Sequence, residues 1–203
     1  MTKTTLTTVG LLILLLAGCG SSPRSSHYVL TAQNASTDPQ TDSPVVGIRP
    51  VEIPAYLKRN NLISQLDGNK LEIAGLHVWG EPLDQGIERV IGLNLAMLLN
   101  TRQILFFPWH PSRSPHYAVE VTLVKLHVID NVGNLVAEWQ VYRTDTSASV
   151  ARSISHLRQP TDTVNFSADD IPALYSQLFY QLSETIAAAI QEDMQAGETD
   201  KSL

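Results

Sequence analysis

The residue with the most specific chemistry in this chain is its one cysteine, Cys19. It closes the sequence Leu16-Ala17-Gly18-Cys19, which follows an apolar run from Val9 to Leu16 and a polar start with one positive charge, Lys3. A basic start, an apolar middle and small residues before a cut are the three parts of a secretory signal peptide. The apolar run is far shorter than the ~20 residues that a membrane-spanning helix needs. We therefore predict a cleaved signal peptide over residues 1–18.

The thiol of Cys19 has a defined role in this setting. Leu-Ala-Gly-Cys is similar to the bacterial lipobox, in which the cysteine receives a diacylglyceryl group and becomes residue 1 after cleavage. We predict lipidation at Cys19, with residues 19–26 as the lipidated cysteine and a flexible tether of small polar residues. Several acyl chains at ~0.8 kcal/mol per buried CH₂ hold such a protein on a membrane permanently. The residue after the cysteine is Gly20, at a position where Asp would retain a bacterial lipoprotein in the inner membrane. We therefore predict that the protein is anchored in the outer membrane and faces the periplasm.

Other residues that could do chemistry form no specific pattern. Acylated Cys19 leaves no thiol for a disulfide, a zinc site or a nucleophile. His110 and His116 share a proline-rich loop but lack metal-ligand spacing, and we expect both to be solvated. His127 alternates with Lys125 on a strand, so we expect it to be exposed. With no nucleotide, hydrolase or metal motif, we predict a non-enzymatic protein without a cofactor.

The size and charge of the chain narrow the function further. Cleavage after residue 18 leaves 185 residues, enough for one domain with a real core. The removed segment carries one Lys and no acid, so 13 basic and 20 acidic residues remain and the mature net charge is −7. This charge argues against nucleic acid as a partner and against a polybasic membrane patch.

Periodic patterns predict both helices and strands. We expect a helix over 81–100, with Pro82 in its first turn and Asn94 inside its apolar face. A second, longer helix starts after Asp169, which we expect to act as its cap together with the adjacent Asp170. Residues 195–203 are expected to form a disordered tail.

The strands are expected over residues 27–31, 45–53, 62–65, 70–73, 103–107, 117–129, 135–142 and 147–157. Asp67-Gly68 indicates a hairpin turn, residues 130–134 a second one, and a phase slip near Leu123 to Lys125 a β-bulge. Together these elements predict an α+β fold, a mostly antiparallel β-sheet with two α-helices packed on one face, as a single domain over 27–194.

Two apolar segments are candidates for a partner interface. The first comprises Trp79, Pro82, Leu83 and Asp84 at the entrance of the helix over 81–100, where Trp79 could alternatively cover the first helical turn. The second comprises Phe106, Phe107 and Trp109, where the large apolar residues exceed the needs of a short strand. Burial in the core is the alternative for this second segment.

Three phrases of the sequence, which follow the run His27-Tyr28-Val29-Leu30 near the predicted lipid, carry a family resemblance together with that run. They are Val51-Glu52-Ile53-Pro54-Ala55-Tyr56-Leu57, Trp79-Gly80-Glu81-Pro82-Leu83-Asp84-Gln85-Gly86-Ile87 and Leu93-Asn94-Leu95. In this order they resemble the PqiC type of the ABC-type transport auxiliary lipoproteins. The resemblance implies an outer-membrane docking subunit that works with a periplasmic MCE-domain protein (PqiB-like) in moving lipids between membranes. It also implies a homo-oligomer and no catalytic residues. A lipid- or lipopolysaccharide-binding chaperone with an apolar pocket between helix and sheet is the alternative.

Overall fold

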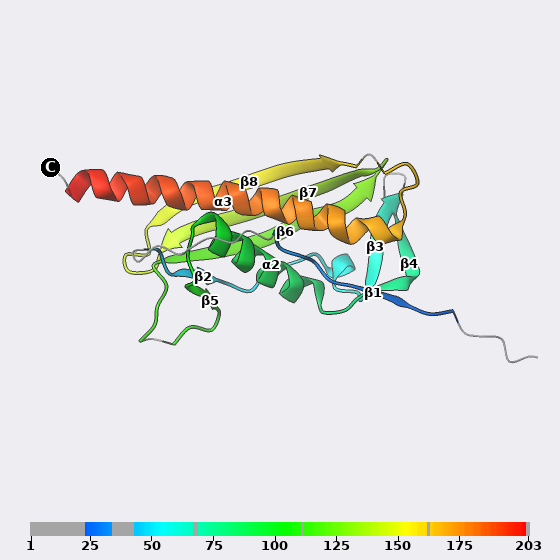
Figure 1. Ribbon diagram of the computed structural model, residues 1–203, viewed down its shortest axis with the longest axis horizontal. Helices are drawn as coiled ribbons and strands as arrows, with labels where there is room; N and C mark the ends of the chain where they lie inside the picture. The colour runs from blue at the N-terminus through cyan, green and yellow to red at the C-terminus, as the bar shows by residue number, and fades with distance from the viewer. Residues whose placement is uncertain (1–22, 34–42, 67–68, 111, 162, 202–203) are drawn as a thin grey trace, which may run out of the picture.

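The computed structural model describes residues 23–33, 43–66, 69–110, 112–161 and 163–201. Two sheets and two long helices form an elongated α+β domain (Figure 1). The predicted signal peptide, Cys19 and the Asp67-Gly68 turn lie outside the described residues. The predicted fold class is confirmed, with the sheets mostly but not purely antiparallel.

The larger sheet has the strand order β5-β2-β6-β7-β8. In that order its strands are Ile104–Phe106, Val46–Ile48, Tyr117–Ile129, Val132–Arg143 and Ser149–Pro160. The long strands β6, β7 and β8 pair antiparallel, whereas β2 runs parallel to both β5 and β6. A register shift between Leu123 and Lys125 confirms the predicted bulge in β6.

The smaller sheet has the order β1-β4-β3, with bounds Ser26–Tyr28, Lys70–Trp79 and Asn61–Leu66. Strands β3 and β4 form the predicted antiparallel hairpin, and β1 pairs parallel with the end of β4. Figure 1 shows this sheet at one end of the domain, with β5 and β2 toward the other end.

Two helices, α2 (Leu83–Leu98) and α3 (Ile171–Lys201), cover one face of the larger sheet. Helix α3 crosses most of the length of that sheet (Figure 1) and buries its apolar stripe there. The packing is close, because a Cβ on Gly133 of β7 would lie 2.8 Å from Leu174 Cγ. Short 3₁₀ turns, Ala55–Leu57 and Ala168–Asp170, complete the described elements.

Several predicted boundaries were wrong. Helix α2 starts at Leu83, two residues later than expected. Pro82 is its N-cap, and does not belong to its first turn as expected. The β6–β7 turn is only Asp130-Asn131, both with positive φ, so β7 begins three residues earlier than expected. Short side chains such as Asp and Asn tolerate the left-handed region that this two-residue turn requires.

The second helix also differs from its prediction at both ends. Ser167, not Asp169, is the cap of the 3₁₀ turn that leads into α3, in a capping box with Asp170. The helix continues to Lys201, so residues 195–201 are not the expected tail. The prediction for His127 was wrong as well, because its side chain is buried. The segment containing Tyr56 and β3 lies against this part of β6, and burial lowers the pKa of His127.

Asn94 occupies the centre of the core as a fully buried amide. Its Oδ1 accepts the Gln33 N–H at 3.1 Å, and its Nδ2 donates to Ser183 Oγ of α3 at 3.4 Å. The residue thus has a backbone partner and also faces a polar neighbour. A buried amide with both ends paired avoids the cost of unsatisfied polar groups.

A candidate docking surface at the β5 end

The structure separates the two predicted interface segments. In the first segment Trp79 is buried and stacks on Tyr175 of α3, with ring centroids 6.3 Å apart. Leu83 is buried in the core, Asp84 is half-buried and, of these four residues, Pro82 alone is exposed. Trp79 and Leu83 are therefore core residues, which removes them from the candidate interface.

The second segment lies at the β5 edge of the larger sheet and remains at the surface. Phe106 and Phe107 are 46% and 45% exposed, and Trp109 is half-buried. The Phe107 and Trp109 rings meet edge to face with centroids 5.4 Å apart. Aromatic pairs prefer this geometry, which adds rigidity to an exposed surface. The Phe106 ring instead lies against Gly92 of α2, so we call Phe107 and Trp109 the aromatic patch.

Trp109 holds the patch against the sheet. Its indole covers Gly47 of β2, where an added Cβ would lie 2.5 Å from Trp109 Cζ2. Its Nε1 donates to the Leu105 carbonyl at 3.3 Å. Only a glycine lets the ring lie this close to the strand, so Gly47 sets the position of the loop after β5.

Arg49 adds a positive charge beside the aromatic patch. Its guanidinium lies 5.0 Å from the Phe107 ring centroid, a cation–π distance. Arg49 Nε is 3.3 Å from Glu120 Oε1, and its Nη1 donates to the Tyr142 hydroxyl at 3.3 Å. No local sequence pattern points to Arg49, because its partners lie on strands far apart in the chain.

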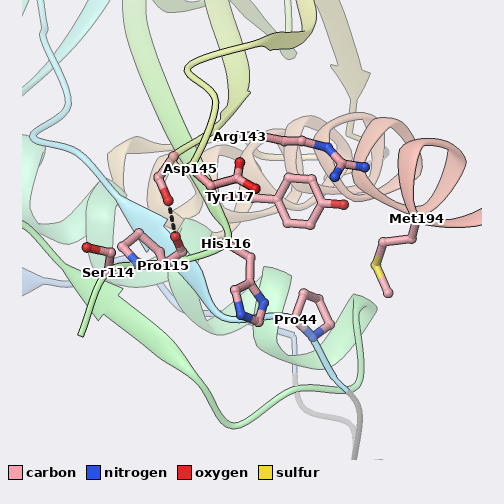
Figure 2. Close-up of a pocket in the computed structure, with 9 residues that line it drawn as sticks. Pro44, Ser114, Pro115, His116, Tyr117, Arg143, Asp145 and Met194 are labelled. Carbon is pink, nitrogen blue, oxygen red and sulfur yellow. Dashed lines mark hydrogen bonds between the residues drawn. The ribbon is translucent and has the colours of Figure 1, made fainter. Parts of the chain in front are cut away.

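A pocket of about 520 Å³ opens near the same end of the domain, lined by loop residues, the ends of β6 and β7, and Met194 of α3 (Figure 2). In it the Tyr117 hydroxyl donates to Asp193 Oδ2 at 2.8 Å, and Arg143 Nε donates to the same oxygen at 3.0 Å. Burial, together with the Asp193 hydrogen bond, raises the pKa of Tyr117 to about 12. Its hydroxyl therefore stays protonated at neutral pH and cannot serve as a base.

The remaining polar groups of the pocket have structural partners. Thr144 Oγ1 donates to the Pro115 carbonyl, as Figure 2 shows, and His116 Nδ1 accepts the Val45 N–H at 3.3 Å. His110 Nδ1 pairs instead with Ser112 Oγ at 2.7 Å. Among the described residues no group of three His, Cys, Asp or Glu side chains could hold a metal ion. This pocket lies at the end of the domain and its lining includes the charged side chains Arg143 and Asp145, unlike the apolar pocket that the chaperone alternative requires.

A further polar cluster, which no sequence pattern indicated, lies at the opposite end. The Tyr28 hydroxyl of β1 bonds to Asp169 Oδ1 and lies 2.7 Å from His77 Nδ1 of β4. The Tyr28 and His77 rings also stack, with centroids 5.7 Å apart. Asp169 therefore ties β1 to the start of α3 rather than capping the helix.

The phrases that carried the family resemblance meet in the structure. The Val51 N–H of the first phrase donates to Glu88 Oε1 of α2 at 2.9 Å. Glu88 is the residue directly after the second phrase. Burial raises the pKa of the Glu88 carboxyl. Asn94 of the third phrase joins α2 to α3 as described above. These residues build the fold, so the phrases mark an architecture rather than a reactive site.

Comparisons with known proteins define the family. The family described as "ABC-type transport auxiliary lipoprotein component" matches residues 28–187. The chain therefore belongs to the ABC-type transport auxiliary lipoprotein family. Within the described ranges, no helix has the length and apolar character needed to cross a membrane.

Two curated relatives and two solved structures are similar to the chain. It is 31% identical over 90 residues to the intermembrane transport lipoprotein PqiC of Escherichia coli, and equally to that of Shigella flexneri. The match covers 42% of this chain and about half, 48%, of each relative. A crystal structure of protein XCC0632 from Xanthomonas campestris shares the fold, with a TM-score of 0.64, 10% identity and coverage of 84% of this chain and 99% of that one. The crystal structure of an uncharacterized protein has a TM-score of 0.68 at 21% identity, covering 83% of this chain and 99% of that one.

Proposed function

We propose that this protein is an outer-membrane lipoprotein, anchored through Cys19, and a non-enzymatic docking subunit of an intermembrane lipid transport system. Its partner in this proposal is a periplasmic protein with MCE domains, and the complex supports the integrity of the envelope. Family membership over residues 28–187 supports the transport role. The name of its relative PqiC, an intermembrane transport lipoprotein, supports transport between membranes.

The observation that carries the docking role is the exposed aromatic patch with Arg49 beside it. Tryptophan, tyrosine and arginine side chains most often dominate the binding energy at protein interfaces, and phenylalanine is also enriched there. Here the Phe107 ring contacts both the Trp109 ring and the Arg49 guanidinium. A ring that is already ordered loses little side-chain freedom when a partner covers it.

The position of the patch suits a subunit that faces away from its membrane. The chain enters the domain at β1, and Figure 1 shows the described N-terminal segment and β5 toward opposite ends of the molecule. A lipid on Cys19 would hold the β1 end at the bilayer. The aromatic patch at the β5 end would then be directed into the periplasm, where an MCE-domain partner can reach it.

We further propose that the protein acts as a homo-oligomer. A single small domain offers a limited surface, whereas a closed ring would present several copies of the aromatic patch to one partner. Mass measurement of the lipidated protein in detergent tests this part of the proposal, and a monomer at all concentrations would contradict it.

The docking role is tested by capture of the MCE-domain protein from the same organism on the lipidated full chain in detergent. We expect wild-type protein and the control variant Ile154→Ser to retain the partner, and Phe107→Ser to lose most of it. Ile154 is a suitable control because it is exposed on β8, outside the patch. If wild-type protein captures no MCE-domain partner, and deletion of its gene leaves detergent sensitivity unchanged, the proposed function is wrong.

A further inference from the structure

Strand β4 carries apolar side chains at the surface of the smaller sheet. Leu71, Ile73 and Leu76 are 41%, 47% and 42% exposed, although they belong to one ten-residue strand. Leu71 and Ile73 alternate with the charged residues Lys70 and Glu72, so they point to the same face. The cost of leaving such side chains in water indicates a surface that something covers.

The direction of β1 indicates which partner covers the exposed apolar residues of β4. Strands β1 and β4 are parallel, with Ser26 opposite His77. Along this pairing, moving from Tyr28 back to Ser26 follows the same direction as moving from Trp79 back to His77. In Figure 1 the described chain before β1 leaves the domain at the end where β3 and β4 lie.

The lengths agree as well. Six residues of strand separate His77 from Leu71, about 20 Å at ~3.3 Å per residue. Seven residues separate Ser26 from Cys19, which can span at most about 25 Å. An acylated Cys19 thus keeps the bilayer surface within reach of Leu71 and Ile73.

We propose that the apolar side chains of β4 rest in the headgroup region of the membrane, as a second attachment beside the lipid on Cys19. This rests on the lipid anchor of the proposed function. The contact is interfacial, because β4 from Lys70 to Leu76 has no strand paired on its β1 side within the described residues. Backbone groups on that open edge need water or headgroup partners and cannot enter the hydrocarbon. The charged residues Lys70 and Glu72 point to the opposite face of the strand and stay in water while Leu71 and Ile73 face the membrane.

Two-point attachment fixes the orientation of the domain. A lipid on a short tether alone would let the domain tumble, whereas a β4 contact holds the long axis away from the membrane. Covering the exposed half of one leucine or isoleucine side chain favours the orientation with β4 on the membrane over the orientation with β4 in water by roughly fivefold. This contact therefore directs the aromatic patch toward the periplasm.

Spin labels test the proposal in the full, lipidated protein reconstituted in vesicles of phosphatidylethanolamine and phosphatidylglycerol. Single cysteines at Leu71→Cys and Ile73→Cys are labelled with a nitroxide, because acylated Cys19 cannot react. Val124→Cys and Ile154→Cys are matched controls, 54% and 56% exposed on the larger sheet. Collision rates with oxygen, which concentrates in lipid, and with a water-soluble nickel complex are then compared.

We expect labels at 71 and 73 to favour oxygen over nickel, and labels at 124 and 154 to show the reverse. Nickel access at 71 and 73 equal to the controls would overturn the membrane contact. Low access to both reagents would also overturn it, since a second copy of the chain or another protein would then cover β4. Radioactive palmitate incorporation separates the two proposals: an unlabelled, uncut precursor contradicts the anchor itself, whereas lipidated protein with water-exposed labels contradicts only the β4 contact.

Discussion

Replacement of Gly47 by alanine is the sharpest test of how the aromatic patch is held. The new Cβ would lie 2.5 Å from Trp109 Cζ2 and 2.6 Å from Pro115 Cγ, closer than real Cβ atoms approach. The indole and proline rings cannot bend away, and β2 is fixed by pairing with β5 on one side and β6 on the other. We therefore expect Trp109 to leave the sheet.

The size of this effect follows from overpacking and a lost hydrogen bond. Overpacking a filled site costs about 1–3 kcal/mol, and the lost bond from Trp109 Nε1 to Leu105 about 1 kcal/mol. We expect the free energy of unfolding to fall by about 2–4 kcal/mol, which shifts a urea midpoint by about 1–2 M. Partner capture through Phe107 should fall as well, because Trp109 no longer supports that ring.

Tryptophan emission and urea unfolding measure both effects. Trp79 and Trp139 are buried, so a red shift in the folded variant reports Trp109 entering water. Gly75→Ala is the matched control, because a Cβ added at this position of β4 would meet nothing within 4 Å beyond its chain neighbours. If Gly47→Ala shows the emission and midpoint of Gly75→Ala, the described packing of Trp109 is wrong.

Two further predictions concern the polar groups of the core and the pocket. Burial raises the pKa of Tyr117 from 10.0 to about 12, so its stabilising contribution is complete below pH 10 and is lost as the pH rises through 12. In denaturant unfolding, we expect the stability difference between wild type and Tyr117→Phe to fall by about 2–3 kcal/mol over this range. A difference that stays constant with pH would contradict the raised pKa. Asn94→Ala removes the acceptor of the Gln33 N–H and the donor to Ser183. We expect it to lower the free energy of unfolding by about 2 kcal/mol or more, and a urea midpoint equal to that of wild type would show that the amide is not needed.

Local patterns in the sequence predicted much of the fold, because hairpins, bulges and amphipathic helices depend on residues close together in the chain. The phase slip at Leu123 to Lys125 is such a pattern, and the structure confirms it. The parallel pairing of β2 with β5 and β6 has no local pattern, since it joins segments about sixty to seventy residues apart. The sequence therefore predicted the strands but not the division into two sheets.

The candidate site was predicted only in part, for the same reason. Phe106 and Phe107 were named from composition, but Arg49 and Gly47 came from long-range packing. Trp79 looked like a surface aromatic at a helix entrance and is buried by Tyr175, almost a hundred residues later. His127 alternated with Lys125 as an exposed residue would, yet another segment covers it.

The central claim is that the aromatic patch meets an MCE-domain partner while Cys19 holds the protein at the outer membrane. Photo-crosslinking in living cells tests this most directly, with a crosslinking amino acid at Phe107 in the lipidated chain and the same amino acid at Ile154 as a control. We predict that the product formed at position 107, and not at 154, contains an MCE-domain protein when identified by mass spectrometry. Crosslinks at 107 to outer-membrane proteins alone, or to the same partners as at 154, would contradict this claim.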